Sequence, residues 1–351
     1  MEGILRSQSF RAFHYQSLND LTEVEHMRDR LNRKAFSIVN HRLREWRKES
    51  NANSVTVKKA GGLHQASQEY ANNMVDSFYR AAISPEDGRE PFSEPYIVSF
   101  CAHTDDDEYV QENGLLSMWR GYGPDGGFAL EIDTKEYWKW IEAGEEVTFD
   151  YGQLGLGQVI YDNATEDEVF TEFEGIVEAF SKFIEDELAG KTSIAGDIYT
   201  PFISAVTRYK HQGFAEESEV RLVAAPLSQR ILDAALEKVP DQVTKLKQVE
   251  YLKTVDPQRP FLTIRGDPNI PMPVKRIIIG PHHDQNEQEQ KVRDLLSELE
   301  MRAVVRCSNS DLIWGALEIP CHFFKLKKRN DTCEMILILI QLFLPCKMAR
   351  S

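Results

Sequence analysis

The sequence predicts a single α+β domain, with a mixed or antiparallel split sheet and helical insertions, on three observations. Short runs of β-branched and aromatic residues alternate irregularly with helical patterns, unlike the regular strand–helix order of a doubly wound sheet. The 351 residues contain no internal repeat and no low-complexity linker, which favours one domain. Hydrophobic residues make up 42% of the chain, enough for a core of ordinary size.

The first part of the chain is predicted to be helical. Apolar residues recur at helical spacing over residues 22–48, and again over about 63–83. Asp20 or Thr22 could cap the first of these helices. The polar stretch 49–62 predicts a loop, and 84–95, with three prolines, predicts a connector.

Strands predominate in the rest of the chain. Short apolar runs with β-branched and aromatic residues predict strands at 96–101, 128–132, 158–161, 219–223, 261–264, 274–279 and 303–305. Helical spacing predicts helices over about 166–188, 194–210 and 285–300.

The charge and cysteine content limit the class of partner. The net charge is −15, so the average field would repel a long nucleic acid, although a local basic groove could still exist. The five cysteines are odd in number and form no CxxC pair, which indicates a reduced, cytoplasmic protein without a cysteine zinc site. The amino-terminal residues include no long apolar run, so no secretory signal is expected.

One apolar run, Met335 to Leu344, lies near the carboxyl terminus. It is shorter than the roughly 20 residues that span a bilayer, so no membrane span is expected. A membrane-surface anchor, a buried or disordered tail, and non-homologous sequence are three interpretations of this run, and the third is preferred.

Two polar and aromatic segments are the best candidates for a site. If 219–223 is a strand, Val220 and Leu222 face the core, whereas Glu219 and Arg221 together face a cleft or solvent. Such a carboxylate could bind a ribose hydroxyl, and such an arginine could hold a phosphate or carboxylate. A solvated strand face with a weak ion pair is the alternative.

The other segment is Ser117-Met118-Trp119-Arg120-Gly121-Tyr122, which precedes a glycine-rich turn. Trp119 and Tyr122 could enclose a planar ring, or they could be a core aromatic pair before a hairpin. We expect this segment and Glu217–Arg221 to meet in one pocket. No metal is expected, because the adjacent His282 and His283 on a loop rarely converge on one ion.

Four ordered elements resemble the bacterial domain-of-unknown-function family 2971, and together they cover about residues 3–309. They are Leu18-Asn19-Asp20-Leu21-Thr22-Glu23; Ile97 to Cys101 followed by Leu116 to Gly123; Lys210-His211 with Phe214, Glu217, Glu219 and Arg221, where Val220 replaces the usual tryptophan; and Ile277 to Pro281.

Both ends depart from the family pattern. Members usually carry an aromatic-His-Tyr-Thr element before a stretch like Gly3 to Ser7, and Phe13-His14-Tyr15-Gln16 lies too close to Asn19 to replace it. Members also tend to end in a strand with S-x-x-P-[YF]-R. The resemblance therefore implies one domain over 1–310, incomplete at its amino terminus, and a divergent tail over 311–351.

The complete family pattern resembles ADP-ribosyltransferase-like proteins, which implies NAD as a substrate and no other cofactor. By this resemblance Tyr122 would border the nicotinamide, Glu219 or Glu217 would orient a ribose hydroxyl, and Arg221 would support the glutamate or a phosphate. The implied ligand-binding set also includes Trp119, Arg120, Ser99 and Lys210.

The leading hypothesis is an NAD-using bacterial effector of the toxin or phage-defence kind, which acts on a nucleotide or macromolecule. Without the amino-terminal histidine element, such a chain would bind NAD weakly or be inactive. The alternative is a non-catalytic nucleotide-binding or protein-binding module.

Overall fold

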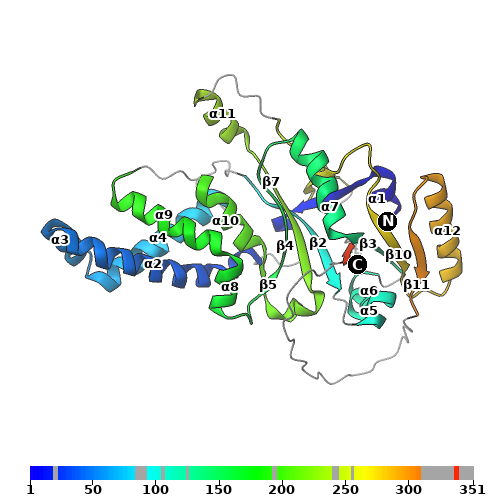
Figure 1. The fold of residues 1–351 in the computed structure, drawn as a ribbon, viewed down its shortest axis with the longest axis horizontal. Helices are drawn as coiled ribbons and strands as arrows, with labels where there is room; N and C mark the ends of the chain where they lie inside the picture. Colours follow the sequence, from blue (N-terminus) through cyan, green and yellow to red (C-terminus); the bar gives the residue numbers. More distant parts are fainter. Residues whose placement is uncertain are drawn as a thin grey trace, which may run out of the picture.

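A computed structural model describes residues 1–18, 23–83, 93–103, 107–123, 126–191, 196–238, 245–253, 257–309 and 336–339. The predicted α+β class is confirmed: one large mixed sheet is flanked by helices, and part of the helical layer extends away from the sheet as an arm (Figure 1).

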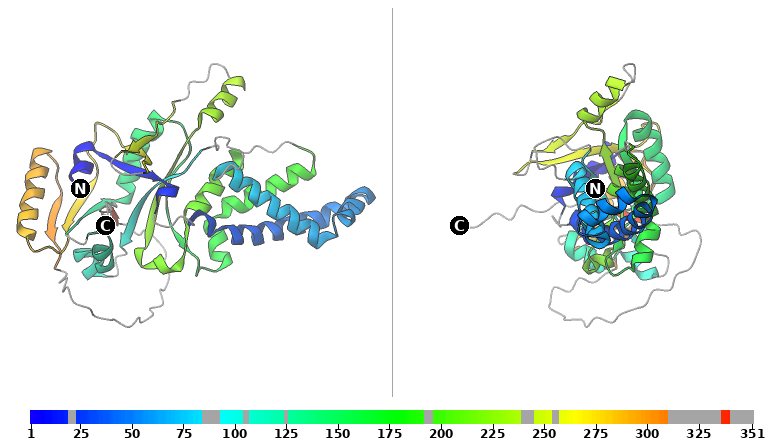
Figure 2. Two further views of the ribbon diagram at one scale, coloured as in Figure 1. Left: turned by 180° about the vertical axis from the view of Figure 1, so that it is seen from behind. Right: turned by 90° about the vertical axis from the view of Figure 1, so that its left-hand side faces the viewer.

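The arm is built on helices α2 (Arg28–Glu49), α3 (Asn51–Lys59) and α4 (Leu63–Ala82). The apolar spacing predicted both long helices, and α2 buries Leu31, Ala35, Val39 and Leu43, four residues apart, on one stripe. Helices α8 (Glu166–Glu172), α9 (Glu174–Leu188) and α10 (Gly196–Thr207) pack against its base (Figure 2).

Several predicted boundaries are wrong for local reasons. The expected loop at 49–62 contains α3, because the Ser50 hydroxyl accepts the Asn53 N–H as an N-cap and no glycine or proline follows until Gly61. The single helix expected over 166–188 breaks at Phe173 into α8 and α9. Helix α2 starts after Met27, and the expected caps at residues 20 and 22 lie outside the described residues.

The large sheet divides at strand β2 (Tyr96–His103). One edge of β2 pairs with β7 (Glu219–Pro226), which continues to β4 (Tyr151–Gln158). The other edge pairs at its start with β1 (Ser9–His14) and at its end with β12 (Ile336–Leu339). Because two strands share one edge of β2, the sheet splits into two wings, as the sequence predicted.

Each wing continues outward from β2. One runs from β1 to β9 (Arg259–Arg265) and β8 (Glu250–Leu252); the other runs from β12 to β3 (Phe128–Asp133), β10 (Val274–Ile279) and β11 (Val304–Cys307). Among the strands that the structure describes in this sheet, only β10 and β11 pair in parallel, so the sheet is mixed. Strands β5 (Ile160–Tyr161) and β6 (Tyr209–Lys210) form a separate parallel pair.

The two faces of the sheet carry different cores. One face packs on α1 (Glu2–Ser7), α7 (Thr134–Ile141) and α12 (Gln285–Glu298). The opposite face carries two separate apolar clusters, one beneath the helical layer and a smaller one beneath α6 (Leu116–Tyr122), next to α5 (Glu108–Asn113). The remaining helix, α11 (Gln229–Lys238), follows β7.

The apolar run near the carboxyl terminus supplies β12, whose residues 336–339 lie between β2 and β3. The rest of that run lies outside the described residues. None of the helices that the structure describes combines the length and the hydropathy that crossing a membrane requires.

Candidate functional site

Strand β7 carries the two central charged residues of the candidate site. Val220 and Leu222 face the core, as the alternation predicted. The expectation that Glu219 and Arg221 face a cleft or solvent is wrong, because they are only 3% and 2% exposed. The sequence shows which residues share a face of the strand, but not which segment covers that face.

The covering segment runs from the end of α10 through β6 to a 3-10 helix, Gln212–Glu217. Ser218 then adopts a left-handed conformation (φ 42°) and reverses the chain into β7. This turn places Lys210 directly over Glu219, and the Lys210 ammonium also lies 4.4 Å from the centre of the Phe214 ring. The spacing of the Lys-His…Phe…Glu-x-Glu-x-Arg element therefore follows from one tight reversal.

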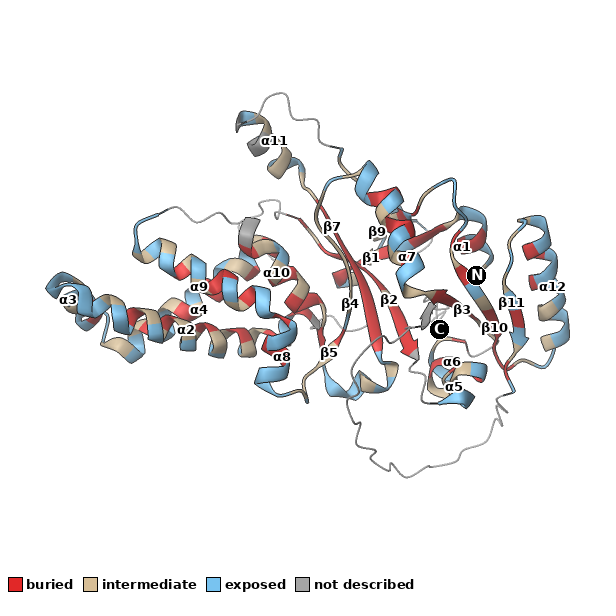
Figure 3. Cartoon of the chain, in the orientation of Figure 1, coloured by how far each residue is buried: buried red, intermediate tan, exposed pale blue. Residues whose placement is uncertain are grey.

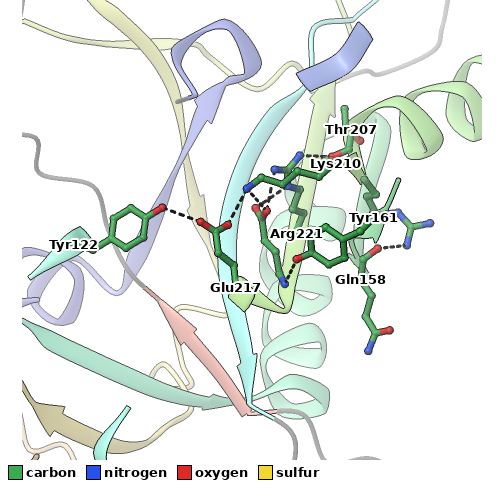
Figure 4. Close-up of polar contacts among 9 residues, drawn as sticks. Tyr122, Gln158, Tyr161, Thr207, Lys210, Glu217 and Arg221 are labelled. Atoms are coloured by element: carbon green, nitrogen blue, oxygen red, sulfur yellow. Dashed lines mark hydrogen bonds and ion pairs between the residues drawn. The ribbon is translucent and has the colours of Figure 1, made fainter. Parts of the chain in front are cut away.

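Hydrogen bonds connect five side chains into one set, here termed the charged cluster (Figure 4): Tyr122, Lys210, Glu217, Glu219 and Arg221. Lys210 Nζ donates to Glu217 Oε2 at 2.8 Å and to Glu219 Oε2 at 2.9 Å. Arg221 donates from Nε and Nη2 to the two oxygens of Glu219, at 2.7 and 3.0 Å. Its Nη1 donates to the carbonyl of Thr207 at 2.6 Å. Two cations therefore balance two carboxylates.

The environment holds Glu219 in its ionised form. Burial by itself would raise the pKa of this carboxyl, but the charges of Arg221 and Lys210 oppose it, together with hydrogen bonds from Arg221 and Ser99. The net effect lowers the pKa of Glu219 to about 2. Glu219 is therefore a fixed negative charge at neutral pH.

Tyr122 is the last residue of α6 and packs against the smaller apolar cluster. Its hydroxyl donates to Glu217 Oε1 at 3.2 Å. Burial and the Glu217 carboxylate raise the pKa of Tyr122 to about 12, so the phenol remains protonated. The Glu217 side chain is 17% exposed and Tyr122 is half-buried, so these two form the accessible edge of the charged cluster.

The other predicted ligand-binding residues divide into two groups. Ser99 hydrogen-bonds Glu219 and lies opposite Arg221 in the β2–β7 pair, so it belongs with the charged cluster. Arg120 is exposed on α6. Trp119 is buried and its Nε1 donates to the Asn113 carbonyl at 2.7 Å, so it packs in the core and lines no ligand surface.

The glycines around Trp119 explain its motif. A Cβ atom at Gly114 would lie 2.8 Å from the indole Nε1, and one at Gly280 would lie 2.7 Å from the indole ring. Gly123 and Gly127 also contact the ring closely. The glycine-rich turn therefore accommodates an indole in the fold, as the core-aromatic alternative expected for Trp119. The hairpin of that alternative is wrong, because β3 pairs with β10 and β12.

The charged cluster lies between the two apolar clusters on one face of the sheet. Along β7, Val223 packs under the helical layer, and Arg221 and Glu219 follow on the same face. On the paired strand β2, Cys101 lies opposite Glu219 and packs with Trp119 beneath α6. Buried residues extend along both strands here (Figure 3). Side chains from both sides of this boundary therefore meet at the charged cluster.

Two residues near the charged cluster, Tyr161 and Arg208, were not among the candidates from the sequence. The Tyr161 hydroxyl accepts the Glu219 N–H at 2.9 Å, and burial raises the pKa of Tyr161 to about 12. Arg208 passes over Gly157, where a Cβ atom would lie 2.1 Å from its Nη1. A glycine inside a strand marks such close approach. Gly157 lies in β4, one residue before the strand predicted at 158–161, so the sequence prediction did not use this signal.

His14 does not reach the charged cluster. Residues that lie opposite each other in an antiparallel pair share a face. Phe13 lies opposite Ile97, and Ile97 lies opposite Val223, so all three share the face of Glu219. His14 therefore projects to the opposite face of the sheet.

Two further features lie away from the charged cluster. The donor atoms of His282, His283 and Asp284 lie within 4.8 Å of one another, but the Asp284 N–H already occupies His282 Nδ1 at 3.0 Å. A cavity of about 530 Å³ lies between β11 and α12 and is lined by Lys275, Arg293, Leu296, Ser297, Met301, Arg302, Ala303, Val304 and Val305. Neither includes a residue of the charged cluster.

One family model matches the chain. It is described as a protein of unknown function (DUF2971), and it covers residues 118–222, which include every member of the charged cluster. The match supports the family resemblance over these residues, and the elements before residue 118 and after residue 222 lie outside it. No curated protein and no solved structure matches the chain.

Proposed function

We propose that this chain, whose residues 118–222 carry the DUF2971 pattern, binds NAD at the edge of the charged cluster and breaks its nicotinamide–ribose bond. The observation that carries the proposal is a buried carboxylate, Glu219, which is ionised at neutral pH and lies beside a second carboxylate, Glu217, that shares its lysine. The ADP-ribosyltransferase resemblance adds support at the level of the fold alone.

The chemistry needs a stabilised cation. When the bond between ribose and nicotinamide breaks, its electron pair leaves with nicotinamide, and the ribose carbon becomes electron-deficient. Preorganised negative charge beside that carbon lowers the barrier. Water or an acceptor hydroxyl, amine or guanidine then adds to the carbon and releases its proton to solvent or to Glu217. The products are nicotinamide and either free or transferred ADP-ribose.

Charge and exposure assign different roles to the two glutamates. Glu217 is at the accessible edge, so it would contact the ribose hydroxyls first. Glu219 lies beneath it, held by Arg221, and would act through its field. Lys210 and Arg221 already donate to the two carboxylates, so the site would receive the nicotinamide-ribose end of NAD and leave its pyrophosphate to other residues. Transfer to a nucleotide or macromolecule would make the chain a toxin-like or phage-defence effector.

Nicotinamide release from labelled NAD tests this function. Wild-type protein, Glu217→Gln and Glu219→Gln are compared, with Glu112→Gln as the control because Glu112 is exposed in an ion pair with Arg306. Loss of an electrostatic group that acts in the transition state lowers turnover by roughly 10²- to 10³-fold. The control should retain wild-type turnover.

Glu217→Gln is the decisive variant, because this side chain lies at the edge and its replacement leaves the buried Arg221–Glu219 pair intact. Circular dichroism and the thermal midpoint confirm that each variant is folded. The proposal fails if wild-type protein releases no nicotinamide, or if folded Glu217→Gln releases it at the wild-type rate.

The burial of Glu219 favours a second candidate, a module that binds a nucleotide without turnover. Both oxygens of this carboxylate already accept hydrogen bonds from side chains packed over it, those of Lys210 and Arg221. Such a module would show saturable heat of binding with NAD or ADP-ribose in calorimetry and no nicotinamide release. Glu217→Gln would then weaken binding and leave the fold unchanged.

A further inference from the structure

The charge of this chain is unevenly distributed. Residues 28–59 contain ten lysines and arginines but three acidic residues, a net charge of +7, whereas the whole chain carries −15. This stretch forms α2 and α3, the two helices that reach the far end of the arm (Figure 1). The average field of the chain therefore does not describe the field at the end of the arm.

The cations near the base of the arm are engaged within the fold. Arg28 pairs with Glu25 and Asp76, and Arg30 donates to two backbone carbonyls. Arg33 pairs with Glu166 on the neighbouring helix. The contacts of Arg28 with Asp76 and of Arg30 are part-buried, so these two cations serve the fold, whereas the exposed Arg33 pair contributes little.

The cations at the far end are exposed. Arg44, Arg47 and Lys48 are spaced three and four residues apart, which places them on one face of α2. Lys58 and Lys59 lie in the last turn of α3. We call these five residues the arm tip. Lys48 pairs with Glu45, but both side chains are more than half exposed, so this pair is weak and readily exchanged.

The neighbours of the arm tip favour a phosphate backbone as its partner. Apart from Glu45, Glu49 and Glu69, they are largely uncharged polar residues, of the types that donate to phosphate and sugar oxygens. They include Ser50, Asn51, Asn53, Ser54, Thr56, Gln65 and Gln68. Val55 is the one exposed large aliphatic side chain of α3, which is too little apolar surface for a membrane anchor.

The shape of the arm tip favours a duplex. Single-strand binding relies on exposed aromatic platforms, but no Phe, Tyr or Trp is exposed between residues 41 and 65, all of which the structure describes. The five cations lie on α2 and α3, which pack on each other and on α4, so they form a surface that can contact several phosphates of a duplex. We propose that the arm tip docks on the phosphate backbone of duplex DNA without reading its sequence.

The affinity of a labelled duplex of mixed sequence, measured by fluorescence anisotropy as a function of NaCl, tests the proposal. Five phosphate contacts give a log–log slope of about −4.5 and a loss of affinity of about 500-fold between about 50 and about 200 mM salt. The triple variant R44Q/R47Q/K48Q should reduce the slope to about −1.8 and the loss to about 10-fold.

The matched control is K291Q/R293Q/R306Q, which removes the same charge from exposed side chains on α12 and β11, at the other end of the molecule. This variant should keep the wild-type slope, and all of these substitutions are at exposed positions and should leave the thermal midpoint unchanged.

The proposal is overturned if wild-type protein does not bind DNA at low salt, or if the arm-tip and control variants change the slope equally. Tighter binding to anionic phospholipid vesicles than to DNA would assign the arm tip to a membrane surface. Tighter binding to duplex RNA than to duplex DNA would overturn the assignment of DNA as the partner.

Discussion

Arg221→Met removes the central cation of the charged cluster while keeping much of its volume. The structure gives Arg221 three donated hydrogen bonds, two to Glu219 and one to the Thr207 carbonyl. After the substitution, Glu219 remains 3% exposed beside Lys210, which must also serve Glu217. Removing one partner of a buried ion pair costs about 3–5 kcal/mol, because the other charge is left uncompensated.

Urea unfolding at pH 7 measures this loss. The control is Arg306→Met, since Arg306 forms an exposed ion pair with Glu112 at 3.1 Å and should contribute about 0–1 kcal/mol. Combining Arg221→Met with Glu219→Gln should cost less than the sum of the two single changes, by about 2 kcal/mol. A loss below about 1 kcal/mol for Arg221→Met would refute a buried, coupled pair.

Three further predictions concern titration and close packing. The pKa of Glu219 is about 2 in the folded protein and higher in the unfolded chain. Its contribution to the free energy of unfolding, about 3 kcal/mol, is therefore present above about pH 4.5 and is lost as the pH falls toward 2. Urea unfolding across this range should show the loss in wild-type protein and not in Glu219→Gln. Tyr122 should ionise near pH 12 by near-ultraviolet absorbance, and Glu217→Gln should lower that pKa; an unchanged value would show that Glu217 has no effect. Gly144→Ala should destabilise by about 1–3 kcal/mol in urea unfolding, because its Cβ would lie 2.2 Å from backbone, whereas Gly3→Ala, with nothing within 4 Å, should not.

The spacing of apolar residues predicted the strands and helices that have one face packed on a large apolar core. The alternation of β7 identified Val220 and Leu222 as core residues, and helical spacing identified the long helices of the arm. It missed β1 and α7, where short apolar runs leave strand and helix ambiguous.

The sequence predicted which residues belong to the candidate site better than it predicted how deeply they are buried. Lys210, Glu217 and Glu219 are close in sequence, so a tight turn could be expected to gather them, whereas the contact with Tyr122 spans 95 residues of chain. Composition and spacing did not show that Glu219 is buried, because burial depends on the segment that folds back over it. Trp119 was assigned to a ligand, but it packs in the core, where Gly280, distant in the sequence, leaves space for the indole ring.

The position of β12 has a consequence for the order in which the fold can form. β2 and β3 lie in the first half of the chain, and the strand between them comes more than 200 residues after β2. Local helices of the arm can form as soon as their residues are available. The join between the two wings is a long-range closure, which carries a large entropic cost and folds slowly. Until β12 is in place, β2 and β3 each present an open edge, and assembly of the sheet centre should be the last and slowest step of folding.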